Sequence, residues 1–338
     1  MSHGTITTVG VYRWDAFHGG DGVIYRTVQE CLRPARFHGK LPFFGGVRPD
    51  GAVDVDGTDL PAKMDAEIRY AVAGGVDYWI FLRYNDRSKC AEMNKAYRVY
   101  RKSPLKDRLR FCWMLSHSVK TPDPDIWQDE RQKTVEAMLD PQWLRVLGNR
   151  PLLYVFFDCD LAMLRRRLDE LRALVQARGA ANPYIVAIDF DASAHGCDAQ
   201  TQWTKNVGQG EPAAAYSEQV NRQNLELLAG QTPAILTAHV NWDSRPYHSY
   251  PPPWWREAPD TWCQMPTRDE YRDRVQQAVR LTHQHPAKCE ANTLFVYAWN
   301  EFTEGGILCP TRRADGTADT TLLDGLALVD KRGGDARP

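Results

Sequence analysis

The sequence has no run of apolar residues long enough to cross a membrane, since a membrane helix needs about 20 of them. It also has no excess of basic residues: 42 Lys and Arg stand against 43 Asp and Glu, which gives a formal net charge of -1. Proteins that bind nucleic acids usually carry a basic excess or a basic face. The sequence therefore predicts neither a membrane protein nor a nucleic-acid-binding protein.

The cysteines lack the spacing of a metal site or a disulfide framework. The eight are Cys31, Cys90, Cys112, Cys159, Cys197, Cys263, Cys289 and Cys309, with no Cys-x-x-Cys pair among them. Zinc sites need close Cys or His pairs, and His283 with His285 does not complete one, so we expect no metal ion. Scattered thiols are typical of a reducing compartment, and residues 1–5 lack the basic and apolar regions of a signal peptide. We expect a cytoplasmic protein, although an exported protein whose signal has been removed would look the same.

The length and composition allow one large folded domain. The chain has 338 residues, of which 43% are hydrophobic and 25% charged, ordinary values for a globular protein with a substantial core. An α/β barrel commonly takes about 250 residues and can exceed 400 with insertions. We expect a single domain over residues 7–330, an N-terminal tail over residues 1–6 and a disordered C-terminal tail over residues 331–338.

Short apolar segments alternate with helical patterns along the whole chain. Eight of them are predicted strands, at residues 7–13, 76–82, 110–115, 151–157, 184–190, 212–216, 234–240 and 294–299. Strands that alternate with helices form a parallel sheet, and eight such strands can close into a (β/α)8 TIM barrel. Residues 18–60 and 241–266 are longer than plain connections, so we expect folded loops on the carboxyl-terminal face of the barrel. The second loop carries Trp254, Trp255 and Trp262, which could wall a cleft or pack on the barrel.

The last predicted strand runs directly into two carboxylates. Glu301 and Glu304 follow it, and Gly305-Gly306 comes next. Residues three apart on a strand face opposite sides, so these side chains can converge only if the chain leaves extended geometry near Phe302. The two glycines make such a turn easy. A pair of acids at one strand end could serve as general acid and general base, although the residues alone are equally compatible with solvated loop charges.

The segment Trp299-Asn300-Glu301-Phe302-Thr303-Glu304-Gly305-Gly306 resembles the signature of glycoside hydrolase family 99 and of the related WbsX-like proteins of polysaccharide biosynthesis. Residues 75–79, 150–154 and 242–246 are similar to further segments of these proteins. The resemblance implies a (β/α)8 barrel that cleaves α-mannosidic linkages. It implies that Glu301 assists the substrate 2-hydroxyl as it attacks the anomeric carbon and that Glu304 is the general acid/base. Phe302 and Thr303 depart from the Trp and His of the family 99 enzymes, which puts an α-mannan substrate in doubt.

Polar and aromatic residues collect at the predicted strand ends, where barrel enzymes have their active sites. The candidate substrate-binding residues are Tyr12, Trp14, Tyr84, His117, Asp158, Asp191, His239, Trp242, Asp243, Trp299 and Asn300. Each of them could equally have a structural role.

The sequence therefore favours a glycoside hydrolase that acts on a polysaccharide or glycan with Glu301 and Glu304, without a cofactor and with retention of configuration. Two alternatives remain open: a glycan-synthesising glycosyltransferase and a non-catalytic carbohydrate-binding barrel. An unrelated metal-dependent hydrolase is the least favoured.

Overall fold

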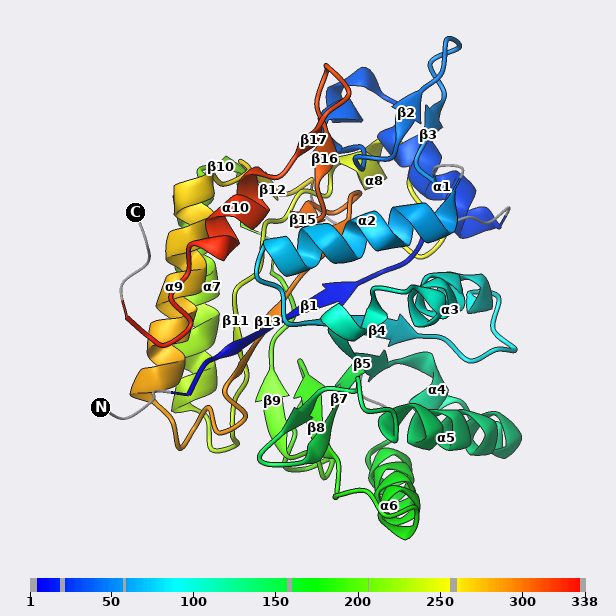
Figure 1. Cartoon of the computed structure of the whole chain (residues 1–338), viewed down its shortest axis with the longest axis vertical. Helices are drawn as coiled ribbons and strands as arrows, with labels where there is room; N and C mark the ends of the chain where they lie inside the picture. The colour runs from blue at the N-terminus through cyan, green and yellow to red at the C-terminus, as the bar shows by residue number, and fades with distance from the viewer. Residues whose placement is uncertain are drawn as a thin grey trace.

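A closed parallel barrel forms the centre of the protein (Figure 1). The computed structural model describes residues 5–18, 22–56, 59–156, 160–205, 207–255 and 260–334. Its barrel strands are β1 (Thr8–Arg13), β4 (Tyr78–Arg83), β5 (Arg110–Leu115), β7 (Arg150–Phe156), β8 (Tyr184–Ile188), β9 (Ala199–Thr201), β11 (Leu236–Thr237) and β13 (Thr293–Val296). They pair in the order β11-β13-β1-β4-β5-β7-β8-β9, and a parallel bridge between Gln200 and Ala234 closes the ring. The predicted (β/α)8 fold is confirmed.

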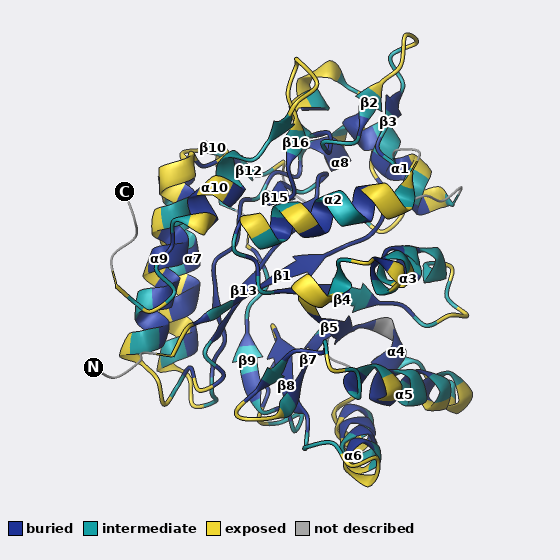
Figure 2. Ribbon diagram, viewed as in Figure 1, coloured by how far each residue is buried: buried dark blue, intermediate teal, exposed yellow. Residues whose placement is uncertain are grey.

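Helices surround the barrel with their apolar faces turned inward. They are α2 (Leu60–Ala73), α3 (Lys95–Lys102), α5 (Pro124–Met138), α6 (Leu161–Ala177), α7 (Ala213–Ala229) and α9 (Arg268–Gln284), and α10 (Thr321–Ala327) packs on α9 and α2. In α6 the buried side chains include Leu164, Leu168, Leu171 and Val175, which recur at helical spacing. Figure 2 shows the resulting pattern, with buried strands inside and exposed residues on the outer sides of the helices.

One predicted strand is wrong. Residues 212–216 do not form the sixth strand; Pro212 is the residue before α7, and Ala213–Ala215 form its first turn. Consecutive alanines favour a helix, and Pro212 suits a helix start. The sixth strand is instead β9, which pairs with β8 through Val186 and Ala199. Its three residues, Ala-Gln-Thr, are too few and too polar to show a strand pattern in the sequence.

The two long loops fold over the carboxyl-terminal ends of the strands. The described part of residues 18–60 contains α1 (Val23–Leu32), the 3-10 helix η1 (Ala35–Lys40) and a hairpin of β2 (Gly46–Val47) and β3 (Val53–Asp54). These elements lie beyond the tip of β1 in Figure 1. The second loop contains α8 (Arg245–Ser249), which packs on α1, and β12 (Trp262–Cys263), which pairs with β10 (Gln209–Glu211). Folded rim loops were predicted, and the described residues confirm them.

Shorter elements complete the connections. They are η2 (Ala91–Asn94), η3 (Lys106–Arg108), α4 (His117–Lys120), β6 (Arg145–Val146), the hairpin of β14 (Asn300–Glu301) and β15 (Gly306–Ile307), and that of β16 (Thr311–Arg312) and β17 (Ala318–Asp319). Beyond α10, Lys331 Nζ donates to Gly75 O at 2.5 Å and to Asp77 Oδ2 at 2.6 Å, and Gln276 donates to Gly334 O at 2.8 Å. Residues 331–334 are therefore tied to the barrel, against the expectation of a disordered tail; residues 335–338 lie outside the described part.

The described part of the chain contains no group of three or more His, Cys, Asp or Glu placed to hold a metal ion. Its seven described cysteines are free thiols, and Cys159 lies outside it. None of the helices in these ranges is long and apolar enough to span a membrane.

A capping box is present at the start of α9, and we expect it to contribute measurably to stability. Thr267 Oγ1 accepts a hydrogen bond from Glu270 N at 3.3 Å, and Glu270 Oε2 accepts one from Thr267 N at 2.8 Å. Thr267→Ala should lower the free energy of unfolding by about 1 kcal/mol, because it leaves a helix N–H without its partner. Urea denaturation measures the loss. Thr267→Ser, which keeps the hydroxyl, is the control, and equal losses in the two variants would contradict the prediction.

Candidate active site

The two glutamates lie on a tight hairpin that follows β13. Glu301 ends β14 and pairs with Gly306 of β15. The chain turns between them, and Glu304 N donates to Glu301 O at 3.0 Å. The backbone therefore leaves extended geometry next to Phe302, as the spacing of the two acids required. This turn brings both carboxylates to one side of the hairpin.

Both carboxylates line a cavity of about 790 Å³ at the carboxyl-terminal end of the barrel. Eight of its lining residues are aromatic: Tyr12, Trp14, Tyr84, Phe156, Trp203, Trp242, Tyr247 and Trp254. The others are Ile24, Leu82, Cys90, Ser116, Lys120, Glu301 and Glu304. The cavity thus combines broad ring surfaces with two acids, and it is large enough for a small ligand.

Burial raises the pKa of both glutamates. Glu301 is only 5% exposed, and its Oε2 has no hydrogen-bond partner among the described residues. The pKa of Glu301 is raised well above the usual range. Burial is the largest cause, followed by the charge of Glu304 and then by the charge of Asp15. Burial also raises the pKa of Glu304 to about 7, although hydrogen bonds from Tyr297 and Tyr247 lower it. Near neutral pH the two acids therefore retain protons, which Glu301 holds more strongly than Glu304.

Four of the predicted substrate-binding residues line the cavity. Tyr12 and Trp14 come from the end of β1, Tyr84 follows β4, and Trp242 follows β11. The indole N–H of Trp14 donates to the hydroxyl of Tyr84 at 3.1 Å. Trp254 also lines the cavity and meets Trp14 edge to face, with ring centroids 6.0 Å apart. The aromatic loop therefore contributes to the cavity wall, as one of its two predicted roles required.

Two other predicted substrate-binding residues lie outside this cavity and make contacts within the protein core. His239 is buried; its Nδ1 accepts a hydrogen bond from Tyr297 N at 3.0 Å and its Nε2 lies 3.1 Å from Gln202 O. Burial lowers the pKa of His239 to about 3, so the ring is neutral. Trp299 packs in the core against Trp79, with ring centroids 5.3 Å apart. These two side chains do not reach the cavity because neighbours in the core surround them.

Three further polar candidates also have partners within the protein. Asp243 is buried and pairs with Arg245 and Lys40, at 2.7 and 2.8 Å. Asp191 is exposed, and its Oδ1 accepts a hydrogen bond from Ala194 N at 3.0 Å. Asn300 bonds to Trp14 N and Asp15, so it supports the cavity wall without lining the cavity. Of the remaining candidates, Asp158 and the side chain of His117 lie outside the described part of the structure.

Three aromatic residues of the cavity, Phe156, Trp203 and Tyr247, were not predicted from the sequence as site residues. Trp203 stacks on Phe156 with ring centroids 4.3 Å apart, and it follows β9, the strand that the sequence did not reveal. Tyr247 lies on α8 within the long loop, and its hydroxyl accepts a hydrogen bond from Thr303 Oγ1 at 2.9 Å. A correct sixth strand would have placed Trp203 at a strand end. Nothing in the local pattern around Tyr247 indicates the contact.

Gly305 is needed where the hairpin touches the loop after β11. Its φ is +84°, and a Cβ added there would lie 2.8 Å from Asp243 N. That amide donates to Glu304 O at 2.7 Å, so it cannot move away without losing the bond. We expect Gly305→Ala to lower the free energy of unfolding by roughly 1–3 kcal/mol or more and to displace Glu304.

The matched control for this substitution is Gly51→Ala. Gly51 also has a positive φ, +77°, but a Cβ there would meet nothing within 4 Å. The difference between the two variants in chemical denaturation therefore isolates the contact with Asp243. Equal losses of stability would show that the close approach is unimportant.

Solved structures of low sequence identity share the fold. Two are of the GH99 endo-alpha-mannosidase from Bacteroides thetaiotaomicron, one of them in complex with bis-tris-propane. The complex aligns with a TM-score of 0.58 at 12% identity and the other structure with 0.57 at 13%, and each alignment covers 95% of both chains. These likenesses confirm the barrel architecture over almost the whole chain.

Sequence comparison identifies the family. No curated protein matches the chain. The model of the family described as glycosyltransferase WbsX matches residues 118–318, which is more than half of the chain and includes the hairpin with Glu301 and Glu304. The protein therefore belongs to the glycosyltransferase WbsX family.

Proposed function

We propose that the protein is a glycoside hydrolase that cleaves a glycosidic bond in a polysaccharide or glycan. The observation that carries this proposal is the pair Glu301 and Glu304, side by side on one hairpin and facing one aromatic cavity. Glycoside hydrolysis needs two carboxyl groups whose protonation differs, and it needs no cofactor. The GH99 enzyme that shares the fold is an endo-alpha-mannosidase, which supports a reaction at a glycosidic bond.

The cavity wall suits a sugar ring. Trp14, Trp203, Trp242 and Trp254 present aromatic surface around the two acids. Indole rings combine an apolar face with a polar N–H, so they can pack against the C–H face of a pyranose while their edges remain available for hydrogen bonds. The substrate class that fits this wall is a neutral or weakly charged saccharide.

The resemblance to family 99 gives each acid a role that the electrostatics can accommodate. A pKa of about 7 lets Glu304 give and take a proton near neutral pH, which suits a general acid/base. Glu301 holds its proton more strongly than Glu304, so it must ionise before it can take the proton of a substrate 2-hydroxyl. We therefore expect activity to increase with pH on the acidic side of the profile, as Glu301 loses its proton.

A glycosyltransferase is the second candidate, because the family is described by that activity. The same acid pair could pass a glycosyl group to a sugar hydroxyl instead of water. A nucleotide-sugar donor would bring a diphosphate beside the two glutamates, and Lys120 is the single cationic side chain among the described lining residues. This charge pattern disfavours a nucleotide-sugar donor. It favours a glycoside donor whose glycosyl group passes to water or to a sugar acceptor.

A glycan panel incubated with the purified protein tests the proposal. We expect release of a product that proton NMR shows to have retained its anomeric configuration, because attack by the substrate 2-hydroxyl followed by ring opening gives two inversions. A 2-deoxy substrate should not react. Turnover only with an activated sugar donor would instead support the transferase, and binding without product in both the native protein and Glu301→Gln would indicate a carbohydrate-binding barrel.

A further inference from the structure

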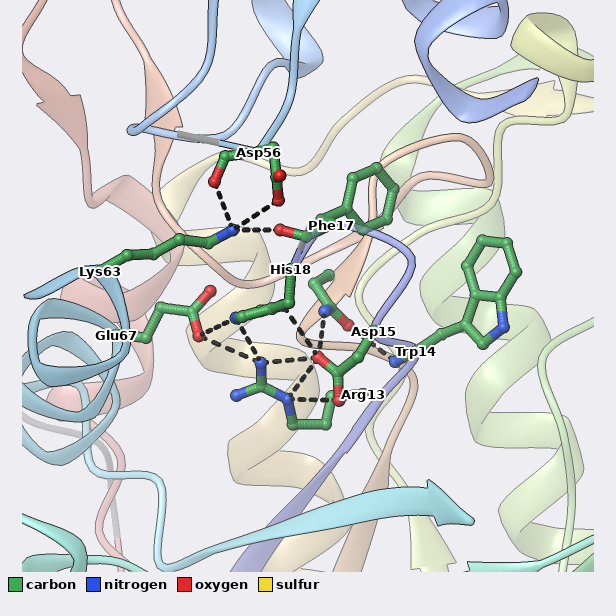
Figure 3. A network of polar contacts seen from close by, with 9 residues as sticks. Arg13, Trp14, Asp15, Phe17, His18, Asp56, Lys63 and Glu67 are labelled. Carbon is green, nitrogen blue, oxygen red and sulfur yellow. Dashed lines mark hydrogen bonds and ion pairs between the residues drawn. The ribbon is translucent and has the colours of Figure 1, made fainter. Parts of the chain in front are cut away.

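A cluster of buried titratable side chains lies next to the candidate active site at the end of β1 (Figure 3). It consists of Arg13, Asp15, His18 and Glu67, and we call it the Arg13 cluster. Arg13 Nη2 lies 2.7 Å from Asp15 Oδ1 and 3.0 Å from Glu67 Oε2. His18 Nε2 lies 3.2 Å from the same Glu67 oxygen. All four side chains are at most 5% exposed.

Packing alone does not account for this cluster. Removing charges from water is unfavourable, and a buried ion pair often stabilises a fold no better than apolar residues of similar size. Glu67 remains ionised: burial opposes its ionisation, yet Arg13 is the largest of the causes that lower the pKa of Glu67 to about 2. Burial lowers the pKa of His18, so its ring is neutral. Titratable groups with shifted pKa values cluster at functional sites, so this cluster is a candidate for a role in the adjacent site.

Hydrogen bonds connect the cluster to Trp14 in the cavity wall and to Asn300, the residue before Glu301. Asn300 Nδ2 donates to Asp15 Oδ1 at 3.1 Å, and Asn300 Oδ1 accepts from Trp14 N at 2.8 Å. Trp14 lines the cavity, and Asn300 directly precedes Glu301. Arg13 orients Asp15 by a two-point contact, with Nε and Nη2 at 2.8 and 2.7 Å from Oδ1. The chain of contacts therefore fixes an aromatic wall residue relative to one of the two acids.

The charge of Asp15 also acts on Glu301. The titratable groups that act on Glu301 or feel its charge are Tyr12 and Asp15 at the end of β1, Tyr84 after β4, Tyr247 on α8, Tyr297 after β13 and Glu304 on the hairpin. Burial holds the pKa of the four tyrosines above its usual value, so they are neutral near pH 7. Asp15 and Glu304 are thus the two carboxyl groups whose charge, when they are ionised, acts on Glu301 in the described part of the chain.

We propose that Asp15 is a positioning residue for Glu301: through Asn300 it holds the segment that carries this acid against Trp14, and the two-point contact with Arg13 keeps its carboxylate next to that segment. The importance of this role for catalysis rests on the proposed function. The effect of the Asp15 charge on the proton of Glu301 does not depend on any substrate, and it can be measured in the protein alone.

The test is a carbon-13 NMR titration of glutamate carboxyl groups in the labelled full-length protein, with the Glu301 signal assigned by its loss in Glu301→Gln. We expect Asp15→Asn to lower the titration midpoint of Glu301 by about one pH unit, a tenfold change in proton affinity, because a like charge has been removed. Asp15→Ser is made alongside, since it removes the charge without presenting an amide to Asn300 Nδ2. Asn300→Ala removes the hydrogen-bonded link and keeps the charge of Asp15, so its midpoint should move less.

Glu67→Gln is the matched control. It removes another buried carboxylate from the Arg13 cluster and leaves the contact between Arg13 and Asp15 in place. We expect a lower melting temperature with an unchanged midpoint for Glu301. A midpoint that stays at the native value in both Asp15 variants, or that moves equally in Glu67→Gln, would overturn the proposal. A shifted midpoint in a protein that turns over no glycan would leave this inference standing and remove the proposed function.

Discussion

Glu304→Gln is expected to lower kcat on the substrate found in the glycan panel by about 10²–10⁴-fold while substrate binding stays nearly unchanged. The amide keeps the shape of the side chain, and its oxygen can still accept the hydrogen bond from the Tyr297 hydroxyl that Glu304 Oε2 receives. It cannot donate a proton to a leaving oxygen at neutral pH. Steady-state kinetics for turnover, together with calorimetry for binding, measure the two effects separately.

Asp191→Asn provides the control for this experiment. It makes the same change from carboxylate to amide at an exposed residue that does not line the cavity, so kcat should stay near the native value. The leaving group matters as well, because a substrate with a good leaving group needs little help from an acid. Near-normal turnover of Glu304→Gln on a substrate with a poor leaving group would exclude Glu304 as the general acid.

The second large effect concerns stability and pH. Burial raises the pKa of Glu304 from 4.5 to about 7 in the folded protein, so the folded state binds more protons than the unfolded state between these two pH values. The free energy of unfolding must then fall as the pH rises through this window. The loss at pH 8 is on the order of 3 kcal/mol for Glu304. The raised pKa of Glu301 adds to it in the same direction.

Glu304→Gln should therefore be more stable than the native protein at pH 8 and close to it at pH 5. The neutral amide has no proton to lose, and removing the charge of Glu304 also lowers the pKa of Glu301. Urea denaturation of both proteins at the two pH values measures the difference. Other buried acids, such as Glu130, whose burial raises its pKa to about 7, affect both proteins alike and cancel. The same pH dependence in the two proteins would show that Glu304 ionises normally in the fold.

Local pattern was sufficient for most of the barrel. Seven of the eight strands were predicted near their observed positions, because a strand covered on both faces reads as a continuous apolar run. The Thr267 capping box and the apolar stripe of α6 are likewise encoded within a few neighbouring residues. The sixth strand failed because β9 has three residues and gets its place from pairing with β8. Trp203, which follows β9, was therefore not predicted to lie at a strand end.

The glutamates themselves were predictable, since Glu301 and Glu304 stand in a recognisable octapeptide after a clear strand. Their shared cavity and their chemistry were decided by the tertiary structure. Gly305 passes against Asp243, and Tyr247 approaches Glu304 from a separate loop. Asp15 acts on Glu301 from the other end of the chain. Burial and charge depend on which atoms lie within a few ångströms, and those atoms are brought there by the closure of the barrel, so no local pattern in the sequence could specify them.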